Sequence, residues 1–453
     1  MSQVIEQQRY TCALAAQQTV AAIPKAHPIV HAGPGCADKV WTFAATSAAN
    51  QGEGYAGGNT ISCTNSGETE VVFGGEKKLT NLVSSALKVL DGDLYVVLTG
   101  CTSDIVGDDS ISVAKRFAKE GYPVVGTETA GFKGNSYYGH NTVVNAIIEQ
   151  FVGEREVNTQ KGLVNVFTVV PYQDPYWRGD LQEIKSLLEA IGLEVNILYG
   201  TESEGIKEWE NIPNAEFNLL VSPWVGLDTV KLLERKYGTP YLHYPVLPIG
   251  AKETSKFLRT VAQFAKLDQD KVEKVIKKEE KRYYEYFEGL IDYYSENRQS
   301  IPTELFTVAD STYGVSVANF LVNEFGVIPK GLYLTDNPTK AKQKLVKEIV
   351  AEKNEKLADI LQFEPDGWNI QEDIKEKIRN PKRAILFGST WEKILAQQLD
   401  AHYVYLSIPI VESVIINKSY VGYRGALTLL EDYFASIYRV GYHGRQVATD
   451  RVV

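Results

Sequence analysis

Three cysteines stand in loops where a sulfur atom can approach a bulky ligand. Cys12, Cys36 and Cys101 all lie within the first 101 of 453 residues. Cys36 closes the turn-forming string His-Ala-Gly-Pro-Gly-Cys, and Cys101 follows a glycine after the apolar run 94–98. Thiolate is the soft ligand of iron–sulfur clusters, which usually take four cysteines. Three suitable positions and an uncertain fourth, Cys63, therefore predict a cluster that another subunit completes or shares.

The spacing of these cysteines does not match the compact metal motifs. They are 24 and 65 residues apart, whereas zinc sites use cysteine pairs about two to four residues apart. Four cysteines in 453 residues are too few for a disulfide scaffold, so a buried bystander thiol is the alternative for each. Glycine beside cysteine favours ligation, because it lets the backbone approach an inorganic core. For Cys63 two interpretations stay open, a fourth ligand and a buried thiol near the cluster.

The composition narrows the class of protein. A formal net charge of −10 argues against a nucleic-acid partner, because phosphate binding needs clustered Lys and Arg. The first residues have no apolar core of signal-peptide type, and no window reaches the roughly 18–20 apolar residues of a membrane span. We therefore expect a soluble cytoplasmic protein without a membrane partner. Its length predicts two or three domains.

Strand-like runs alternate with amphipathic helical stretches along the whole chain, which is typical of parallel, doubly wound sheets. We predict an α/β fold of three Rossmann-like domains, an N-terminal one with the cluster cysteines, a middle one, and a C-terminal one with a closing helix and tail. Ligands bind at the carboxyl ends of strands in such sheets, where Cys101 is placed. The chain lacks the P-loop motif. The expected domains are residues 1–158, 159–300 and 301–453.

Other residues are expected to have structural roles. His31 is predicted to order its loop by hydrogen bonding. Asp108 and Asp109 are predicted to cap the helix that begins near residue 110, because carboxylates accept the free N–H groups of a first turn. A long charged helix is expected over 268–297. Its predicted core face consists of Val272, Val275, Tyr283, Tyr284, Phe287, Ile291 and Tyr294.

Six segments make the chain resemble the nitrogenase component 1 family. The string Val-Phe-Gly-Gly-Glu-Lys-Lys-Leu is highly specific, and the order and distances of the segments also fit. The resemblance covers nearly the whole chain. The segments are residues 31–36, 69–79, 99–109, 131–136, 388–392 (Gly-Ser-Thr-Trp-Glu) and 420–426.

The resemblance implies an ATP-dependent reductase of several subunits. It implies pairing with a homologous α-type subunit in an α2β2 heterotetramer, with an interface iron–sulfur cluster of P-cluster type or [4Fe-4S] type. Cys12, Cys36 and Cys101 match its ligands. Phe73 matches an apolar residue of the docking surface for a separate ATP-hydrolysing iron protein, which delivers electrons. In a protein without this resemblance, a Phe before Gly-Gly is more often a core or turn anchor.

The resemblance also favours the β-type subunit, which holds no substrate-reducing cofactor. The family's cofactor-binding Cys and His fall at Ser222 and near Glu412, which are unsuitable ligands, and no cysteine follows Cys101. The cofactor is therefore expected in the α-type partner. Segment 419–427 also looks more like the β-type subunit.

Among family functions, we favour a nitrogenase-like reductase of small organosulfur compounds, a methylthio-alkane reductase. Segments 10–14 and 32–36 differ from those of standard dinitrogenase β subunits. A dinitrogenase β subunit and a scaffold subunit for nitrogenase cofactor assembly remain the alternatives. A cluster-free α/β ligand-binding protein with incidental cysteines is the alternative from another class.

Overall fold

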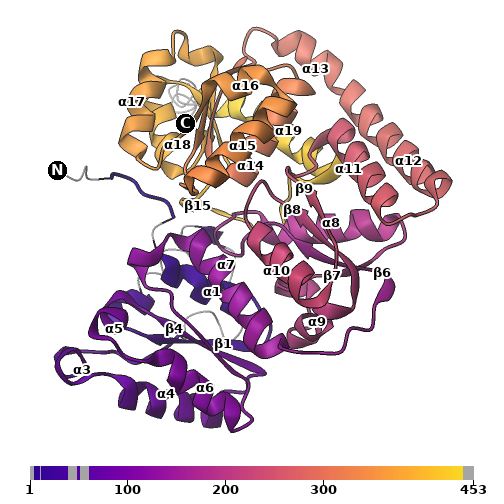
Figure 1. The fold of residues 1–453 in the computed structure, drawn as a ribbon. Coiled ribbons are helices and arrows are strands. Elements are labelled where there is room, and N and C mark those ends of the chain that lie inside the picture. Colours follow the sequence, from indigo (N-terminus) through magenta and orange to yellow (C-terminus); the bar gives the residue numbers. More distant parts are fainter. Residues whose placement is uncertain (1–4, 11, 39–47, 51–60, 442–453) are drawn as a thin grey trace, which may run out of the picture.

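Three parallel β-sheets, each covered by helices, follow one another along the chain (Figure 1). The computed structural model describes residues 5–10, 12–38, 48–50 and 61–441. The predicted α/β fold with three parallel-sheet units is confirmed. In each unit, apolar strands that are buried on both faces require helices on both sides of the sheet.

The first sheet has the order β3-β1-β4-β5, and all its pairs are parallel. Ile29 and Val97 point to one face and pack against α4 and α6, while Val30 and Leu98 point to the other. This alternation follows from the period of two along a strand. The strands are β1 (Ala26–His31), β3 (Ser62–Cys63), β4 (Leu94–Thr99) and β5 (Val124–Thr127); the helices include α1 (Ala16–Ala21), α3 (Glu68–Phe73), α4 (Glu76–Val89), α5 (Cys101–Val106), α6 (Ser110–Lys119) and α7 (Ser136–Ile147).

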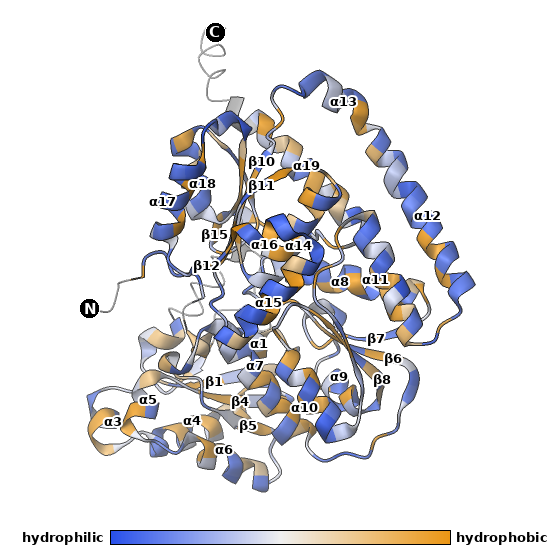
Figure 2. Ribbon diagram, turned by 45° about the horizontal axis from the view of Figure 1, so that its top comes forward, coloured by the Kyte–Doolittle hydropathy of each residue, from blue (hydrophilic) through white to orange (hydrophobic). Residues whose placement is uncertain are grey.

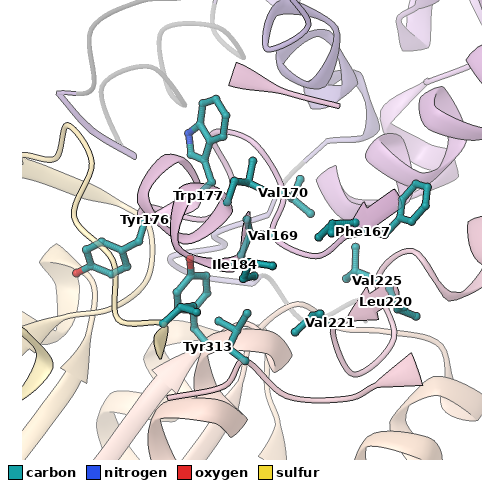
Figure 3. Close-up of a cluster of buried hydrophobic side chains, with 14 of the residues drawn as sticks. Phe167, Val169, Val170, Tyr176, Trp177, Ile184, Leu220, Val221, Val225 and Tyr313 are labelled. Carbon is teal, nitrogen blue, oxygen red and sulfur yellow. The ribbon is translucent and has the colours of Figure 1, made fainter. Parts of the chain in front are cut away.

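The middle sheet has the order β7-β6-β8-β9. Figure 3 shows how buried side chains from its strands and from α8 gather beside Tyr313, which comes from the third unit. The first and second cores are therefore continuous with the third. The elements are β6 (Gln160–Phe167), α8 (Trp177–Ala190), β7 (Glu194–Asn196), α9 (Ile206–Asn211), β8 (Ala215–Val221), α10 (Leu227–Tyr237), β9 (Tyr241–Tyr244) and α11 (Gly250–Phe264).

The third sheet has five parallel strands in the order β12-β11-β10-β13-β14. The long C-terminal helix α19 packs against α11 and against α12 (Gln269–Glu288) as well as against β14, so it joins the last two units. The elements are β10 (Glu304–Ala309), α14 (Ser311–Asn323), β11 (Ile328–Leu334), α15 (Lys340–Lys353), α16 (Glu355–Ile360), β12 (Leu361–Phe363), α17 (Gly367–Lys377), β13 (Ala384–Gly388), α18 (Thr390–Leu399), β14 (His402–Tyr405) and α19 (Gly422–Gly441).

Two further features complete the fold. A short parallel pair joins β2 (Ala48–Asn50) to β15 (Ile410–Val414), so a loop of the third unit touches the first. The predicted long helix is two helices, α12 (Gln269–Glu288) and α13 (Leu290–Asn297). They lie at the periphery of the molecule (Figure 2).

The predicted core face of this helix is wrong at three positions. Tyr284, Ile291 and Tyr294 are exposed, at 46%, 62% and 49%. Val272 and Tyr283 are buried as predicted. The physical reason is that α12 packs on α11 and α19 along one side only, and α13 contacts α19 through Tyr293, whose ring centroid lies 5.3 Å from that of Phe434.

Within the part of the chain described by the structure, none of the helices combines the length and apolar character needed to cross a bilayer.

Candidate metal centre

The carboxyl edge of the first sheet gathers the cysteines. Cys101 is the first residue of α5, directly after β4. Cys36 lies in the helical segment 34–38 that follows β1, and Cys63 ends β3. Because β3, β1 and β4 are parallel neighbours, their carboxyl ends share one edge of the sheet.

Gly131 brings the sulfur atoms of Cys12 and Cys101 to one place. A β-carbon added to Gly131 would lie 2.9 Å from Cys12 Sγ and 3.3 Å from Cys101 Sγ. The Gly131 backbone N–H also donates a hydrogen bond to Cys101 Sγ, at 3.2 Å. Gly131 follows β5, the next strand of the same sheet, so the edge supplies a backbone donor to a sulfur. Such donors are among the features that tune cluster potentials.

The thiols are half-buried and influence one another. Burial raises the pKa of the Cys12 thiol, and the nearby Cys101 and Cys36 raise it further. Burial, and then Cys101, raises the pKa of the Cys36 thiol in the same way. Cys12 and Cys36 each lie close enough to Cys101 for that neighbour to contribute to the rise in their pKa.

Cys63 lies beside this group. Its thiol donates to the Ala32 carbonyl and accepts from the Asn65 N–H, both at 3.4 Å. Burial raises the pKa of the Cys63 thiol, and the nearby Cys36 contributes to the rise. Cys63 is thus near enough to sense Cys36, while its own hydrogen bonds are satisfied by backbone.

A hydrogen-bond network holds the loops of this edge together. His31 Nε2 contacts Asp108 Oδ2 at 2.9 Å, and its Nδ1 contacts Thr64 Oγ1 at 3.0 Å. The predicted hydrogen-bonding role of His31 is confirmed, although these partners lie outside its own loop. The loops that follow β1, β3 and β4 are therefore tied to one imidazole.

Of the two predicted helix caps, one is correct and one is wrong. Asp109 caps α6 by accepting from the Ser112 N–H at 2.9 Å, as predicted. Asp108 does not cap this helix. Its carboxylate instead accepts from the Gly75 N–H at 2.8 Å and contacts His31, because the turn between α5 and α6 directs it back toward the sheet edge.

Phe73 is the last residue of α3 and is 83% exposed, which excludes a core anchor. Val72 in the same helix and Ile105 in the neighbouring α5 are 69% and 74% exposed. The three residues, referred to below as the apolar surface, belong to α3 and α5, which lie at the extremity of the first unit (Figure 1). The Gly74–Gly75 turn behind Phe73 is held by Asp108, so the surface is anchored to the cysteine edge.

The donor atoms at this edge are thiols, which suit an iron–sulfur cluster. Among the residues that the structure describes, no three His, Cys, Asp or Glu side chains converge closely enough to hold one metal ion. Soft thiols spread along a glycine-lined edge suit a larger iron–sulfur core with further ligands from outside this chain. The residues present therefore fit such a group.

The side chains of Ser222 and Glu412 both contact other residues of the chain. Ser222 is fully buried, and its hydroxyl contacts Thr312 Oγ1 at 3.3 Å and accepts from the Val225 N–H. Glu412 lies on β15 and forms an ion pair with Lys393.

Gly131 is the contributor to this edge whose role the sequence did not specify. It lies in the recognised segment 131–136, but nothing near it in the chain indicates a contact with Cys12. The available signal was its position after β5, because that strand ends at the same edge as β4.

The fold and the cysteine-lined edge define the class of protein. It has three parallel-sheet units, and the first of them carries thiols at the edge where ligands bind. A family model described as nitrogenase component 1 type oxidoreductase matches residues 11–438. The chain belongs to this family of oxidoreductase subunits, and the predicted resemblance is confirmed. Family members bind iron–sulfur clusters and form heterotetramers of α-type and β-type subunits.

Individual relatives support the assignment over most of the chain. The nitrogenase molybdenum-iron protein beta chain of Methanococcus maripaludis is 25% identical over 450 residues, covering 92% of this chain and 91% of that protein. The molybdenum-iron protein alpha chain of Methanosarcina barkeri is 32% identical over 265 residues, 57% of this chain but only 48% of that protein. The solved structure Nitrogenase Cp1 at pH 6.5 has a TM-score of 0.76 at 21% identity, covering 97% of this chain and 94% of that one. This last likeness supports the fold alone.

Proposed function

We propose that this chain is the β-type subunit of a nitrogenase-like, ATP-dependent reductase in the cytoplasm. Cys12, Cys36 and Cys101 hold one half of an iron–sulfur cluster at the seam with an α-type partner, which carries the substrate-reducing cofactor. The observation that carries the proposal is the meeting of two cysteine sulfurs at Gly131, on the edge that also bears Cys36. A cluster bound there supplies one-electron transfer.

The chain's own residues bind and shield this group. The half-buried thiols provide soft ligands, and the Gly131 N–H orients Cys101 Sγ. His31 and Asp108 keep the cysteine loops in register. Phe73, Val72 and Ile105 offer an exposed apolar surface to the iron protein, since exposed apolar patches are typical of partner sites.

The substrate we favour is a small organosulfur compound of the methylthio-alkane class. The departures of segments 10–14 and 32–36 from standard dinitrogenase β subunits support it. Turnover of methylthio-alkanes by the purified complex with its iron protein would support the proposal. Turnover of dinitrogen would make the chain a dinitrogenase β subunit, and transfer of a cofactor precursor without turnover would make it a scaffold.

The ligand assignment is tested by iron and sulfide analysis of the complex purified without oxygen. Cys36→Ala should reduce iron, sulfide and activity together, because one thiolate of the cluster is lost. Cys63→Ser is the matched variant, and retention of iron in it would make Cys63 a buried thiol. Unchanged iron in Cys36→Ala would show that Cys36 is not a ligand. A colourless, iron-free monomer would reject the whole proposal.

A further inference from the structure

A buried arginine lies three residues before Cys12 and reaches the third unit. The Arg9 and Glu392 side chains are 0% and 1% exposed, and Arg9 Nη2 lies 2.5 Å from Glu392 Oε1. The Arg9 guanidinium also lies over the Trp391 ring, 5.0 Å from its centroid. The segment leading into Cys12 is therefore fixed by residues of the recognised string 388–392, for which the proposed function gives no role.

This string is built to present the Glu392 carboxylate to Arg9. Ser389 caps α18, and its N–H and hydroxyl both donate to Glu392 Oε2, at 2.8 Å and 2.7 Å. A β-carbon on Gly388 would lie 2.6 Å from Glu392 Oε2, so only glycine lets the side chain fold back there. One carboxylate oxygen thus closes the capping box and the other receives Arg9. Burial raises the pKa of Glu392, but the charge of Arg9 and the hydrogen bonds from Ser389 have the larger effect, so the pKa is lowered overall. The carboxyl group is therefore ionised, and Arg9 and Glu392 form an ion pair.

The segment before Cys12 has further anchors on the third unit. The Gly367 N–H donates to the Glu6 carbonyl at 2.8 Å, and Gln371 Nε2 donates to Gln7 Oε1 at 2.7 Å. Both partners belong to α17, the helix that precedes β13. Residues 6–9 are therefore held by α17 and α18 of the third sheet.

The other side of Cys12 is anchored to the first unit. The Ala13 N–H donates to the Gly134 carbonyl at 3.1 Å. A β-carbon on Gly139 would lie 2.0 Å from the Ala13 carbonyl oxygen, so α7 approaches this backbone as closely as glycine allows. Cys12 lies between these two sets of anchors, one on each unit.

We propose that Arg9 and Glu392 are positioning residues for Cys12, so that the third unit fixes the placement of a cluster ligand in the first. Arg9 Nε and Nη1 have no hydrogen-bond partner within the described ranges. A buried ion pair with unpaired donors is a poor source of stability, but it enforces one geometry. This inference rests on the proposed function only in taking Cys12 as a ligand.

The first experiment measures the placement of Cys12 without any metal. The full chain is prepared free of iron, and alkylation of each cysteine by a maleimide is followed by mass spectrometry. Arg9→Met and Glu392→Gln should raise the alkylation rate of Cys12 roughly tenfold or more. The reason is that the segment around Cys12 must open locally to expose the thiol, and in the variants this opening no longer requires a buried ion pair to break. Cys101 should change little and serves as the internal reference.

Lys353→Met is the matched control. Lys353 and Glu253 form another buried ion pair, 2.6 Å long with side chains 13% and 9% exposed, on α15 and α11. Its removal tests whether the loss of a buried ion pair elsewhere in the molecule also loosens Cys12. Equal acceleration in Lys353→Met and Arg9→Met would overturn the positioning role, as would an unchanged Cys12 rate in the Arg9 and Glu392 variants. Should Arg9→Met not fold, Glu392→Gln carries the same test, because it removes the charge and keeps the size.

The second experiment uses the iron-loaded complex. Arg9→Lys keeps the charge but not the planar fork of donors, so it should shift the midpoint potential or the electron paramagnetic resonance signal of the cluster at unchanged iron content. Lys353→Met should leave both readouts as in the unaltered complex. An unaltered signal in Arg9→Lys and in Glu392→Gln would contradict the inference. An iron-free wild-type complex would reject the proposed function instead, and the alkylation result would still decide whether Arg9 positions Cys12.

Discussion

Asp180 connects the three chain segments that meet between the second and third units, and it makes their junction sensitive to pH. It lies on α8 and is fully buried. Its Oδ1 accepts from Ser419 Oγ at 2.6 Å and from the Tyr420 N–H at 3.3 Å, and its Oδ2 accepts from the Tyr313 hydroxyl. Burial raises the pKa of Asp180 from 3.8 to about 7, although these hydrogen bonds work against the rise.

The sign of the pH dependence follows from the two pKa values. Between pH 3.8 and about 7, folded Asp180 keeps its proton while the unfolded chain loses it, so the unfolding free energy falls as pH rises. The fall is about 1.4 kcal/mol per pH unit and roughly 4 kcal/mol in total. About 1.4 kcal/mol of this lies between pH 6 and pH 8, and above that the contribution is constant.

Asp180→Asn imitates the protonated carboxyl at every pH. We expect the variant to gain about 1.4 kcal/mol relative to the wild type between pH 6 and pH 8, measured by urea unfolding at several pH values. Glu253→Gln serves as a contrast, because the pH dependence of the stability that Glu253 contributes has the opposite sign. Although burial raises the pKa of Glu253, the nearby Lys353 lowers it overall, so the stability that Glu253 contributes is present at high pH and lost as pH falls. A stability difference between wild type and Asp180→Asn that does not change from pH 6 to pH 8 would refute the reasoning.

Three further predictions concern the cysteine edge and its surface. Gly131→Ala should lower cluster content and cost about 1–3 kcal/mol of stability, because its β-carbon would lie 2.9 Å from Cys12 Sγ; unchanged iron and unfolding would contradict this. Phe73→Ala should change stability by less than about 0.5 kcal/mol but slow electron delivery by the iron protein in stopped-flow assays, whereas Val89→Ala, at a position 80% exposed on α4, should do neither. Asp108→Ala should cost about 1–3 kcal/mol in urea unfolding, because it leaves buried donors unpaired; a neutral result would mean that water replaces the carboxylate.

Local pattern was enough to predict much of the architecture. The apolar run 94–98 became β4, and the mostly apolar segment 304–309 became β10, because strands buried on both faces are rich in apolar residues. The run 94–98 also correctly placed Cys101 after a strand end. Asp109 capped α6 as its position before the helix required. These features depend on neighbours a few residues away, which a sequence displays directly.

Errors arose where a residue's environment depended on distant segments. Ile291 and Tyr294 have the spacing of a core face, but among the described residues they are 62% and 49% exposed. Asp108 has the position of a helix cap, but the turn after α5 directs it to Gly75 and His31. Periodicity indicates which side of a helix is apolar, but not whether another element packs against it.

The sequence by itself determined which ligands are available, namely soft thiols in loops of small residues. It also determined the α/β class of the fold and the order of the motifs that place the chain in its family. Only the tertiary structure decided that the sulfurs of Cys12 and Cys101 meet at Gly131, and that Arg9 is paired with Glu392, 383 residues away. The physical reason is that residue type and local spacing are set along the chain, whereas burial and ion pairing are set by which distant segments share one volume. In each parallel sheet the carboxyl ends of the strands lie along one edge, so loops from distant parts of the chain meet there.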